Sequence, residues 1–157
     1  MKEIPLEYMM PCAAPGTLEQ MSVPGLPDAT VYLPAGYGET DERYPVFILL
    51  HGGGGDQFSF FSVDGILKNM IDHMTEAGEI RRMIIVAPCY YAIGRNNDGV
   101  DYAEDAVREF ETTLTRKILP LIDEKYRTIP EKRSRGIGGF AMGAVATWYI
   151  MMMEGTE

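Results

Sequence analysis

Three short segments, each followed by a helical pattern, constrain the fold of this chain more than any other feature of its sequence. The segments lie at residues 44–50, 83–87 and 135–140, and the first two are apolar without alternation, as in strands buried on both faces. Apolar residues at helical spacing follow at residues 59–77, 102–126 and 145–153. Strands that alternate with helices build a parallel sheet with crossover helices. We therefore predict an α/β fold with helices on both faces of a mostly parallel sheet.

Prolines and glycines mark the expected boundaries of these elements. Six prolines among the first 34 residues exclude long helices there, and the β-branched and aromatic residues 30–33 predict a short strand. Gly78 follows the helical pattern at residues 59–77 as an expected helix stop. Pro120 lies inside the pattern at residues 102–126, where we expect it to kink the helix.

Composition and charge exclude several classes of function. The 157 residues carry a formal net charge of −9 and are 46% hydrophobic, which indicates one globular domain and excludes intrinsic disorder. The apolar runs are shorter than the ~20 residues of a membrane span, and the negative charge repels a phosphate backbone. We therefore expect neither membrane nor nucleic acid as a partner. Cys12 and Cys89 lie far apart without a C-x-x-C spacing, so we expect two separate thiols and no metal site.

The segment from Gly139 to Gly143 carries the main chemical signal. It reads Gly-Phe-Ala-Met-Gly between an expected strand and an expected helix. The nucleophile elbow of hydrolases reads G-x-S-x-G in the same context. Glycines are needed there because side chains at those two positions would collide with the neighbouring strand and helix. The pattern therefore predicts an elbow with Ala141 at the nucleophile position.

A glycine loop after the first buried strand is the second signal. It runs from His51 through four glycines to Asp56. Such a loop leaves backbone N–H groups accessible, and in the hydrolase arrangement one of them joins the N–H of the residue after the nucleophile, here Met142, in an oxyanion hole. A phosphate loop is the alternative, but the sequence lacks G-x-x-x-x-G-K-[ST]. Order and context therefore favour a hydrolase.

The chain resembles the feruloyl and acetyl-xylan esterases of carbohydrate esterase family one, which are close to the esterase D group of α/β-hydrolases. The matching stretches are residues 31–34, 44–56, 86–91, 119–122 with Tyr126, and 138–143. The resemblance implies the α/β-hydrolase fold, with Ala141 in place of the nucleophilic serine. It also implies an oxyanion hole made by Met142 and a loop glycine, Gly53 or Gly52.

The resemblance further implies a substrate site around the glycine loop. It assigns His51 and Gly54 to that site as loop residues, with His51 not acting as the general base. Tyr90 and Tyr91 follow the end of a strand, where open α/β sheets bind ligands, and are expected to line the pocket. A packed loop corner is the alternative for both tyrosines. We expect His73, beside the apolar stripe of its helix, to be a surface or half-buried residue.

Two departures from the family pattern affect activity. A methyl group at residue 141 cannot attack an ester, so we expect the chain to be inactive. An engineered serine-to-alanine change and natural loss of the hydroxyl both fit, and the intact glycines favour the first. The catalytic acid and histidine follow the nucleophile in this fold, yet no histidine follows Ala141. We therefore expect residues 1–157 to be the N-terminal portion of one domain, truncated after the elbow helix and completed by its missing C-terminal part.

The resemblance predicts a serine carboxylesterase that hydrolyses feruloyl or acetyl substituents of plant xylan without a metal or organic cofactor. A catalytically dead hydrolase-fold binding module and an esterase D-like thioester hydrolase are the alternatives. The first ten residues lack the apolar stretch of a secretory signal. The location is therefore open, although the resemblance implies a secreted or cell-surface parent enzyme.

Overall fold

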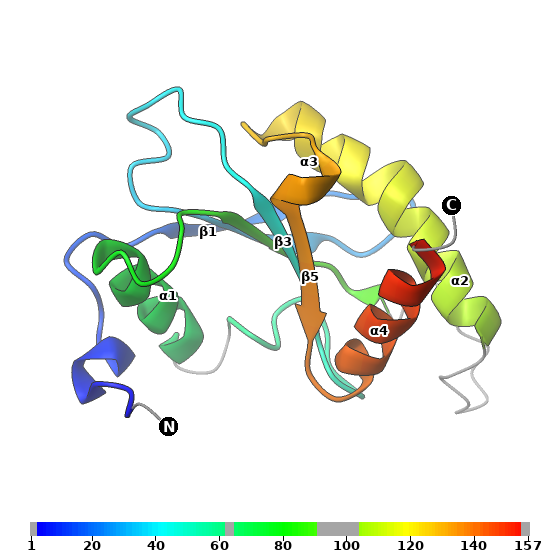
Figure 1. Ribbon diagram of the computed structural model, residues 1–157, viewed down its shortest axis with the longest axis horizontal. Helices are drawn as coiled ribbons and strands as arrows, with labels where there is room; N and C mark the ends of the chain where they lie inside the picture. Colours follow the sequence, from blue (N-terminus) through cyan, green and yellow to red (C-terminus); the bar gives the residue numbers. More distant parts are fainter. Residues whose placement is uncertain (1–2, 62–64, 91–103, 155–157) are drawn as a thin grey trace.

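The computed structural model describes residues 3–61, 65–90 and 104–154, which fold around one five-stranded mixed sheet (Figure 1). In spatial order the strands are β1 (Thr17–Met21), β2 (Ala29–Leu33), β4 (Ile84–Ala87), β3 (Val46–Leu50) and β5 (Arg135–Gly139). β3 runs parallel to both β4 and β5, whereas β1 and β2 add antiparallel on the β4 side. The four predicted strands are confirmed to within two residues at either end.

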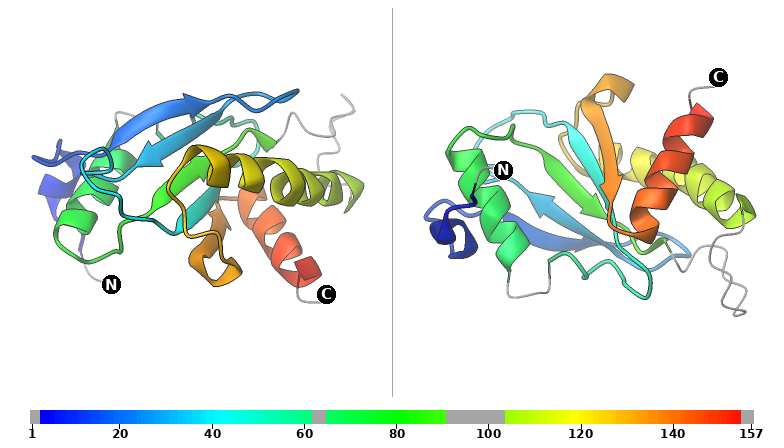
Figure 2. Two further views of the ribbon diagram at one scale, coloured as in Figure 1. Left: turned by 90° about the horizontal axis from the view of Figure 1, so that it is seen from above. Right: turned by 60° about the horizontal axis from the view of Figure 1, so that its bottom comes forward.

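Helices cover both faces of the sheet, as predicted (Figure 2). They are η1 (Leu6–Met9), α1 (Ile66–Glu76), α2 (Glu104–Thr113), η3 (Leu114–Ile118), α3 (Leu119–Lys125), η4 (Lys132–Ser134) and α4 (Met142–Glu154). Side chains of β4 alternate between two hydrophobic clusters. Ile84 and Val86 pack with residues of α2, η3, α3 and α4, whereas Ile85 and Ala87 pack with Ile71 of α1. This double burial explains why β4 is apolar at every position.

The start of one helix and the regularity of another differ from the sequence expectation. The helix expected over residues 59–77 begins at Ile66, after Gly65 in the left-handed region at φ 65°. It ends where expected, because Gly78 takes φ 69° and its N–H bonds to the Thr75 carbonyl at 3.1 Å. The helical run over residues 104–125 widens into the π-helical segment η3 just before Pro120. Proline cannot bond to the carbonyl four residues earlier, so a local change of helix type accommodates it.

A buried carboxylate ties α1 to the sheet. Asp72 is 2% exposed. It accepts hydrogen bonds from the Gly16 N–H at 2.8 Å and the Tyr32 hydroxyl at 2.7 Å, and it pairs with Lys68 at 2.7 Å. Burial and this carboxylate raise the pKa of Tyr32. These three hydrogen bonds offset the free energy lost when the Asp72 carboxylate is removed from water.

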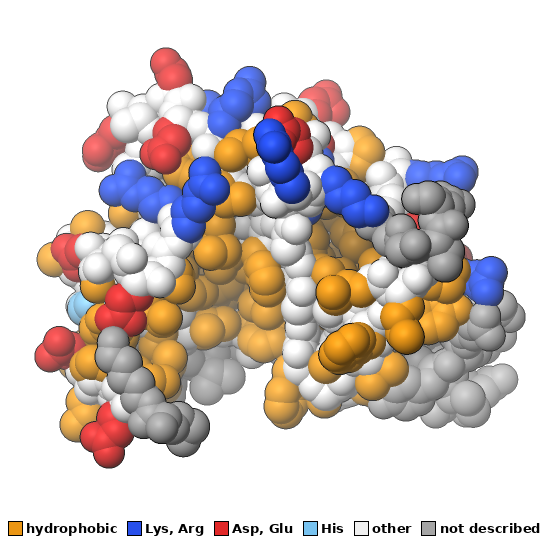
Figure 3. All heavy atoms as spheres, viewed as in Figure 1, with side chains coloured by type: hydrophobic (Ala, Val, Ile, Leu, Met, Phe, Trp, Pro, Cys, Tyr) orange, Lys and Arg blue, Asp and Glu red, His pale blue; other side chains and the backbone are white. Residues whose placement is uncertain are grey.

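The edge of the sheet at β5 and the outer side of α4 carry exposed apolar groups. Among the described residues, β5 pairs with β3 alone. Trp148 and Met152 of α4 are 67% and 70% exposed, and hydrophobic side chains gather over α4 and beside β5 (Figure 3). A pocket of about 570 Å³ lies next to this edge, between Ile137 of β5 and Ile150 of α4. Within the described residues, no helix combines the length and apolar composition needed to cross a membrane.

Candidate active site

A strained turn between β5 and α4 forms the centre of the site. Ala141 has φ 50° and is the one non-glycine residue with positive φ in the described part of the chain. That conformation costs a residue with a side chain about 1–2 kcal/mol. The turn is closed by the N–H of Gly143, which bonds to the Phe140 carbonyl at 2.8 Å, and α4 begins at once. A strained residue between a strand and a helix is the geometry of a nucleophile elbow.

The two elbow glycines are required by close backbone approach. A Cβ on Gly139 would lie 2.5 Å from the carbonyl carbon of Gly143 and 2.7 Å from the carbonyl oxygen of Leu50. A Cβ on Gly143 would overlap that same Leu50 oxygen and lie 2.8 Å from the carbonyl oxygen of His51. The predicted collision with the neighbouring strand and helix is thus confirmed. The elbow is wedged against the end of β3, which brings the glycine loop to it.

The glycine loop passes directly beside Ala141. A Cβ on Gly52 would lie 3.5 Å from the Cβ of Ala141. The loop turns back through a hydrogen bond from the Gly55 N–H to the Gly52 carbonyl at 3.1 Å, with Gly54 at φ 73°. Gly53 and Gly54 are exposed at its tip.

Met142 flanks Ala141 on the other side, as the first residue of α4. The N–H groups of a helix's first turn point out of the helix and favour negative charge. The structure therefore places Ala141 next to Met142 and beside Gly52, and an oxyanion hole made by these residues stays a prediction.

His51 and Tyr90 hold the start of the glycine loop in place. His51 is 1% exposed, and its Nδ1 lies 2.9 Å from the Gly52 carbonyl oxygen. The Tyr90 hydroxyl donates to the His51 carbonyl at 2.8 Å. The Tyr90 ring packs between the His51 ring, at 4.6 Å, and the Phe110 ring, at 5.2 Å. These contacts fix the loop at the end of β3.

Sequence reasoning did not identify Phe110 as part of this support. Its only signal was its place in the apolar stripe of residues 102–126, which does not say what a helix packs against. Contact of Tyr90 and His51 with a substrate stays a prediction. Tyr91 lies outside the described residues.

The rings of both histidines are held by neighbouring groups. The His51 ring is held behind the loop by Gly52 and Tyr90. His73 lies on α1, where its ring stacks on Tyr8 at 5.1 Å.

Comparisons with known proteins point to one family. The family model named "Esterase" matches residues 23–154. The chain is 32% identical over 161 aligned positions to endo-1,4-beta-xylanase Y of Acetivibrio thermocellus, and 34% identical over 130 positions to an endo-1,4-beta-xylanase/feruloyl esterase of Xylanibacter ruminicola. These alignments cover 94% and 79% of the chain but 14% and 17% of the relatives.

Solved structures agree with this match. A serine-to-alanine mutant of the feruloyl esterase module from Clostridium thermocellum, complexed with sinapinate, superposes with a TM-score of 0.76 at 29% identity. A ferulic acid esterase from the anaerobic fungus Anaeromyces mucronatus superposes with a TM-score of 0.77 at 24% identity. Both comparisons cover 97% of the chain, which spans 54% and 60% of the two solved chains.

Proposed function

Because the chain belongs to the Esterase family and has the α/β-hydrolase fold, we propose that it is the nucleophile-bearing part of a serine carboxylesterase. The observation that carries this proposal is the strained φ of 50° at Ala141, wedged between two glycines and beside the glycine loop. Such strain is kept where a side chain must be aimed into a reaction site. A serine at residue 141 would give its proton to a base and attack the ester carbonyl, and the alcohol would leave as the acyl-enzyme forms. Water would then release the acid and regenerate the serine.

The oxyanion of this reaction would be held by backbone N–H groups on both sides of residue 141. Met142 would supply one donor from the first turn of α4, and Gly53 or Gly52 the other. Each such donor is worth about 3 kcal/mol of transition-state stabilisation. Ala141 has no hydroxyl to deliver, so the chain as it stands would retain this hole without forming an acyl-enzyme.

The names of the relatives support an ester of plant polysaccharide as the substrate. Two matching proteins are named as xylanases, one of them also as a feruloyl esterase, and a matching structure is a feruloyl esterase module bound to sinapinate. We infer that the parent enzyme removes feruloyl or acetyl groups from xylan. A thioester substrate and a purely binding role are the alternatives.

Restoring the nucleophile tests the proposal. Ala141→Ser should be made in a chain extended through the rest of the domain, and assayed on methyl ferulate, an aryl acetate and an S-acylglutathione. Removing a nucleophilic serine costs on the order of 10⁶ in kcat, so the restored serine should give turnover where Ala141 gives none. Ala144→Ser, which adds the same hydroxyl inside α4, is the matched control and should stay inactive.

The three substrates separate the alternatives. Turnover of methyl ferulate or the aryl acetate supports the carboxylesterase, and preference for the thioester supports the esterase D-like alternative. Silence on all three, with the variant folded, leaves the binding module.

We also infer that the C-terminal part of the same domain covers β5 and α4. This part would pair with the β5 edge, bury Trp148 and Met152, and supply the acid and histidine that the elbow needs. An uncovered edge strand with exposed apolar neighbours is an aggregation hazard. We expect the 157-residue chain to self-associate, and Trp148→Lys with Met152→Lys to shift it towards monomer in sedimentation. If the 157-residue chain is already monomeric without these two substitutions, the inference is wrong.

A further inference from the structure

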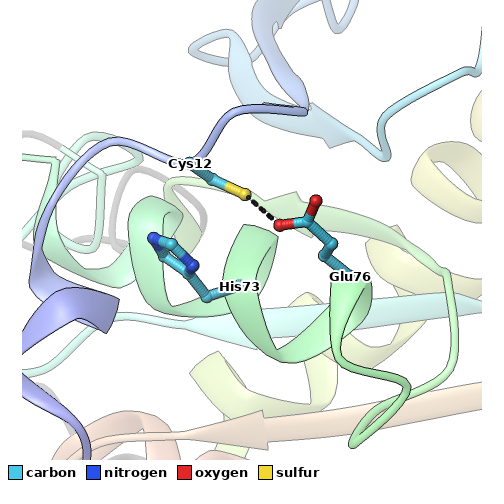
Figure 4. A group of neighbouring side chains, drawn as sticks. All are labelled: Cys12, His73 and Glu76. Atoms are coloured by element: carbon cyan, nitrogen blue, oxygen red, sulfur yellow. Dashed lines mark hydrogen bonds between the residues drawn. The ribbon is translucent and has the colours of Figure 1, made fainter.

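Three side chains of types that can bind a metal ion lie close together where the segment before β1 crosses α1 (Figure 4). They are Cys12, which is 7% exposed, and His73 and Glu76 of α1. One ligand atom from each lies within 4.8 Å of the other two. His73 and Glu76 share a face of the helix because they are three residues apart. The Cys12 thiol donates to Glu76 Oε2 at 3.0 Å, so two of the three groups already touch.

Two contacts restrict the orientation of the His73 ring. Its Nε2 lies 3.0 Å from the Met10 carbonyl oxygen. In a neutral imidazole this contact places the hydrogen on Nε2 and leaves the lone pair on Nδ1. Histidines that bind metals commonly donate their other N–H to a backbone carbonyl in this way. The Tyr8 ring stacks on the imidazole, with 5° between the two ring planes and 5.1 Å between the two centroids. This stacking further restricts rotation of the imidazole.

The local charge also suits a cation. Asp72 and Glu79 flank the cluster on α1 and just beyond it, and Lys68 is paired with Asp72. A pocket of about 250 Å³ lies beside Glu76, and its charged lining residues are Asp72, Glu76 and Arg82.

We propose that Cys12, His73 and Glu76 bind one Zn²⁺ ion, with water as the fourth ligand. A thiolate, an imidazole and a carboxylate form a donor set that suits zinc, whereas Mg²⁺ and Ca²⁺ take oxygen ligands. Zinc–ligand bonds of about 2.0–2.3 Å place the donors about 3.3–3.6 Å apart in a tetrahedron. The donors of Cys12 and Glu76 already lie 3.0 Å apart, so the His73 nitrogen is the donor that has to move closer, by roughly 1 Å. On binding, the Cys12 sulfur exchanges its proton for a bond to zinc, and the proton passes to solvent.

The ion would tie the N-terminal segment to α1. Cys12 and Glu76 are 64 residues apart in sequence, and the site lies on the face of the sheet opposite α4 (Figure 1). Cysteine spacing predicts no metal here, because the other ligands come from a helix that only the fold brings near. The inference does not depend on the esterase function, because none of the three residues belongs to the elbow or the glycine loop.

Zinc titration of the reduced, chelator-treated full chain tests the site. Calorimetry should show one Zn²⁺ per chain, and added Zn²⁺ should raise the thermal midpoint. Cys12→Ser and Glu76→Gln should each weaken binding at least about tenfold. Cys89→Ser and the exposed Glu109→Gln are the matched controls for thiol and carboxylate, and should bind as the parent does.

Two outcomes would overturn the site. One is the absence of a one-to-one zinc complex in the folded parent chain. The other is Zn²⁺ binding that Cys12→Ser and Glu76→Gln weaken no more than the two controls do. Glu76 is exposed, so Glu76→Gln keeps the test decisive if Cys12→Ser fails to fold. With Co²⁺ in place of Zn²⁺, a thiolate-to-metal absorption band should appear in the parent and be absent in Cys12→Ser.

Discussion

Adding one methyl group at Gly143 should destabilise the fold far more than the same change at either of two other glycines. The new Cβ would overlap the Leu50 carbonyl oxygen and lie 2.7 Å from its carbon. Both are backbone atoms, so relief requires α4 to move away from β3. Overpacking costs about 1–3 kcal/mol where side chains can adjust and more where they cannot, so we expect Gly143→Ala to cost about 3 kcal/mol or more.

Gly54 and Gly38 provide the matched comparisons. Gly54 has φ 73° but nothing within 4 Å of its Cβ position. Alanine there would therefore be destabilised only by the strain of the left-handed backbone conformation. That strain costs about 1–2 kcal/mol, less the ~0.4–1 kcal/mol gained by restricting the unfolded chain. Gly38 has open space and no positive φ, so Gly38→Ala should be neutral or slightly stabilising.

Urea unfolding of the full chain, followed by circular dichroism, measures all three changes. The expected order of lost stability is residue 143, then residue 54, then residue 38. A total stability of about 5–15 kcal/mol is typical of a domain, so the loss at Gly143 should shift the midpoint clearly. Equal losses at Gly143 and Gly54 would refute the close approach of the elbow to β3, and with it the steric argument for the motif.

Three further predictions concern the two buried tyrosines that support the loop and the sheet. Tyr90→Phe removes the hydroxyl that donates to His51 and should cost about 1–2 kcal/mol in urea unfolding; an unchanged midpoint would show that the loop does not need this bond. Tyr32→Phe takes one donor from the buried Asp72 and should cost about 1–3 kcal/mol, with a neutral result contradicting the account of that carboxylate. The raised pKa of Tyr32 means that the folded chain keeps this proton at a pH where the unfolded chain loses it. Stability should therefore fall as pH rises above about 10, and less steeply in Tyr32→Phe; parallel curves would argue against it.

The elbow could be predicted from sequence because its pattern encodes local backbone geometry. Gly139 and Gly143 are required by contacts that any strand–turn–helix of this tightness makes, and Ala141 stands between them at a fixed spacing. The buried strands were predictable for a similar reason, since burial on both faces leaves an apolar run in the sequence.

The start of α1 was harder to predict, because apolar periodicity does not distinguish a helix from the turns before it. Residues 58–61 form a turn in which the Phe61 N–H bonds to the Phe58 carbonyl at 3.0 Å. Gly65 then takes a left-handed conformation, and the helix begins at Ile66. The apolar spacing runs through this region without a break, so the pattern alone placed the helix too early.

Contacts between distant segments were not predictable from patterns at all. The support of the glycine loop by Tyr90, and of Tyr90 by Phe110, depends on how α2 packs against the sheet. The approach of Cys12 to α1 depends on the path of the chain before β1. Neither contact leaves a pattern in the spacing of residues along the sequence.

The left-handed conformation of Ala141 has a consequence for how this site can change over generations. The strain belongs to the backbone and is imposed by Gly139, Gly143 and the end of β3, so serine and alanine experience it equally. The geometry that aims a nucleophile is thus maintained whether or not the hydroxyl is present. Alanine and serine codons can differ by a single base. At this position the gain or loss of the attacking group is therefore a one-nucleotide event that leaves the fold unchanged.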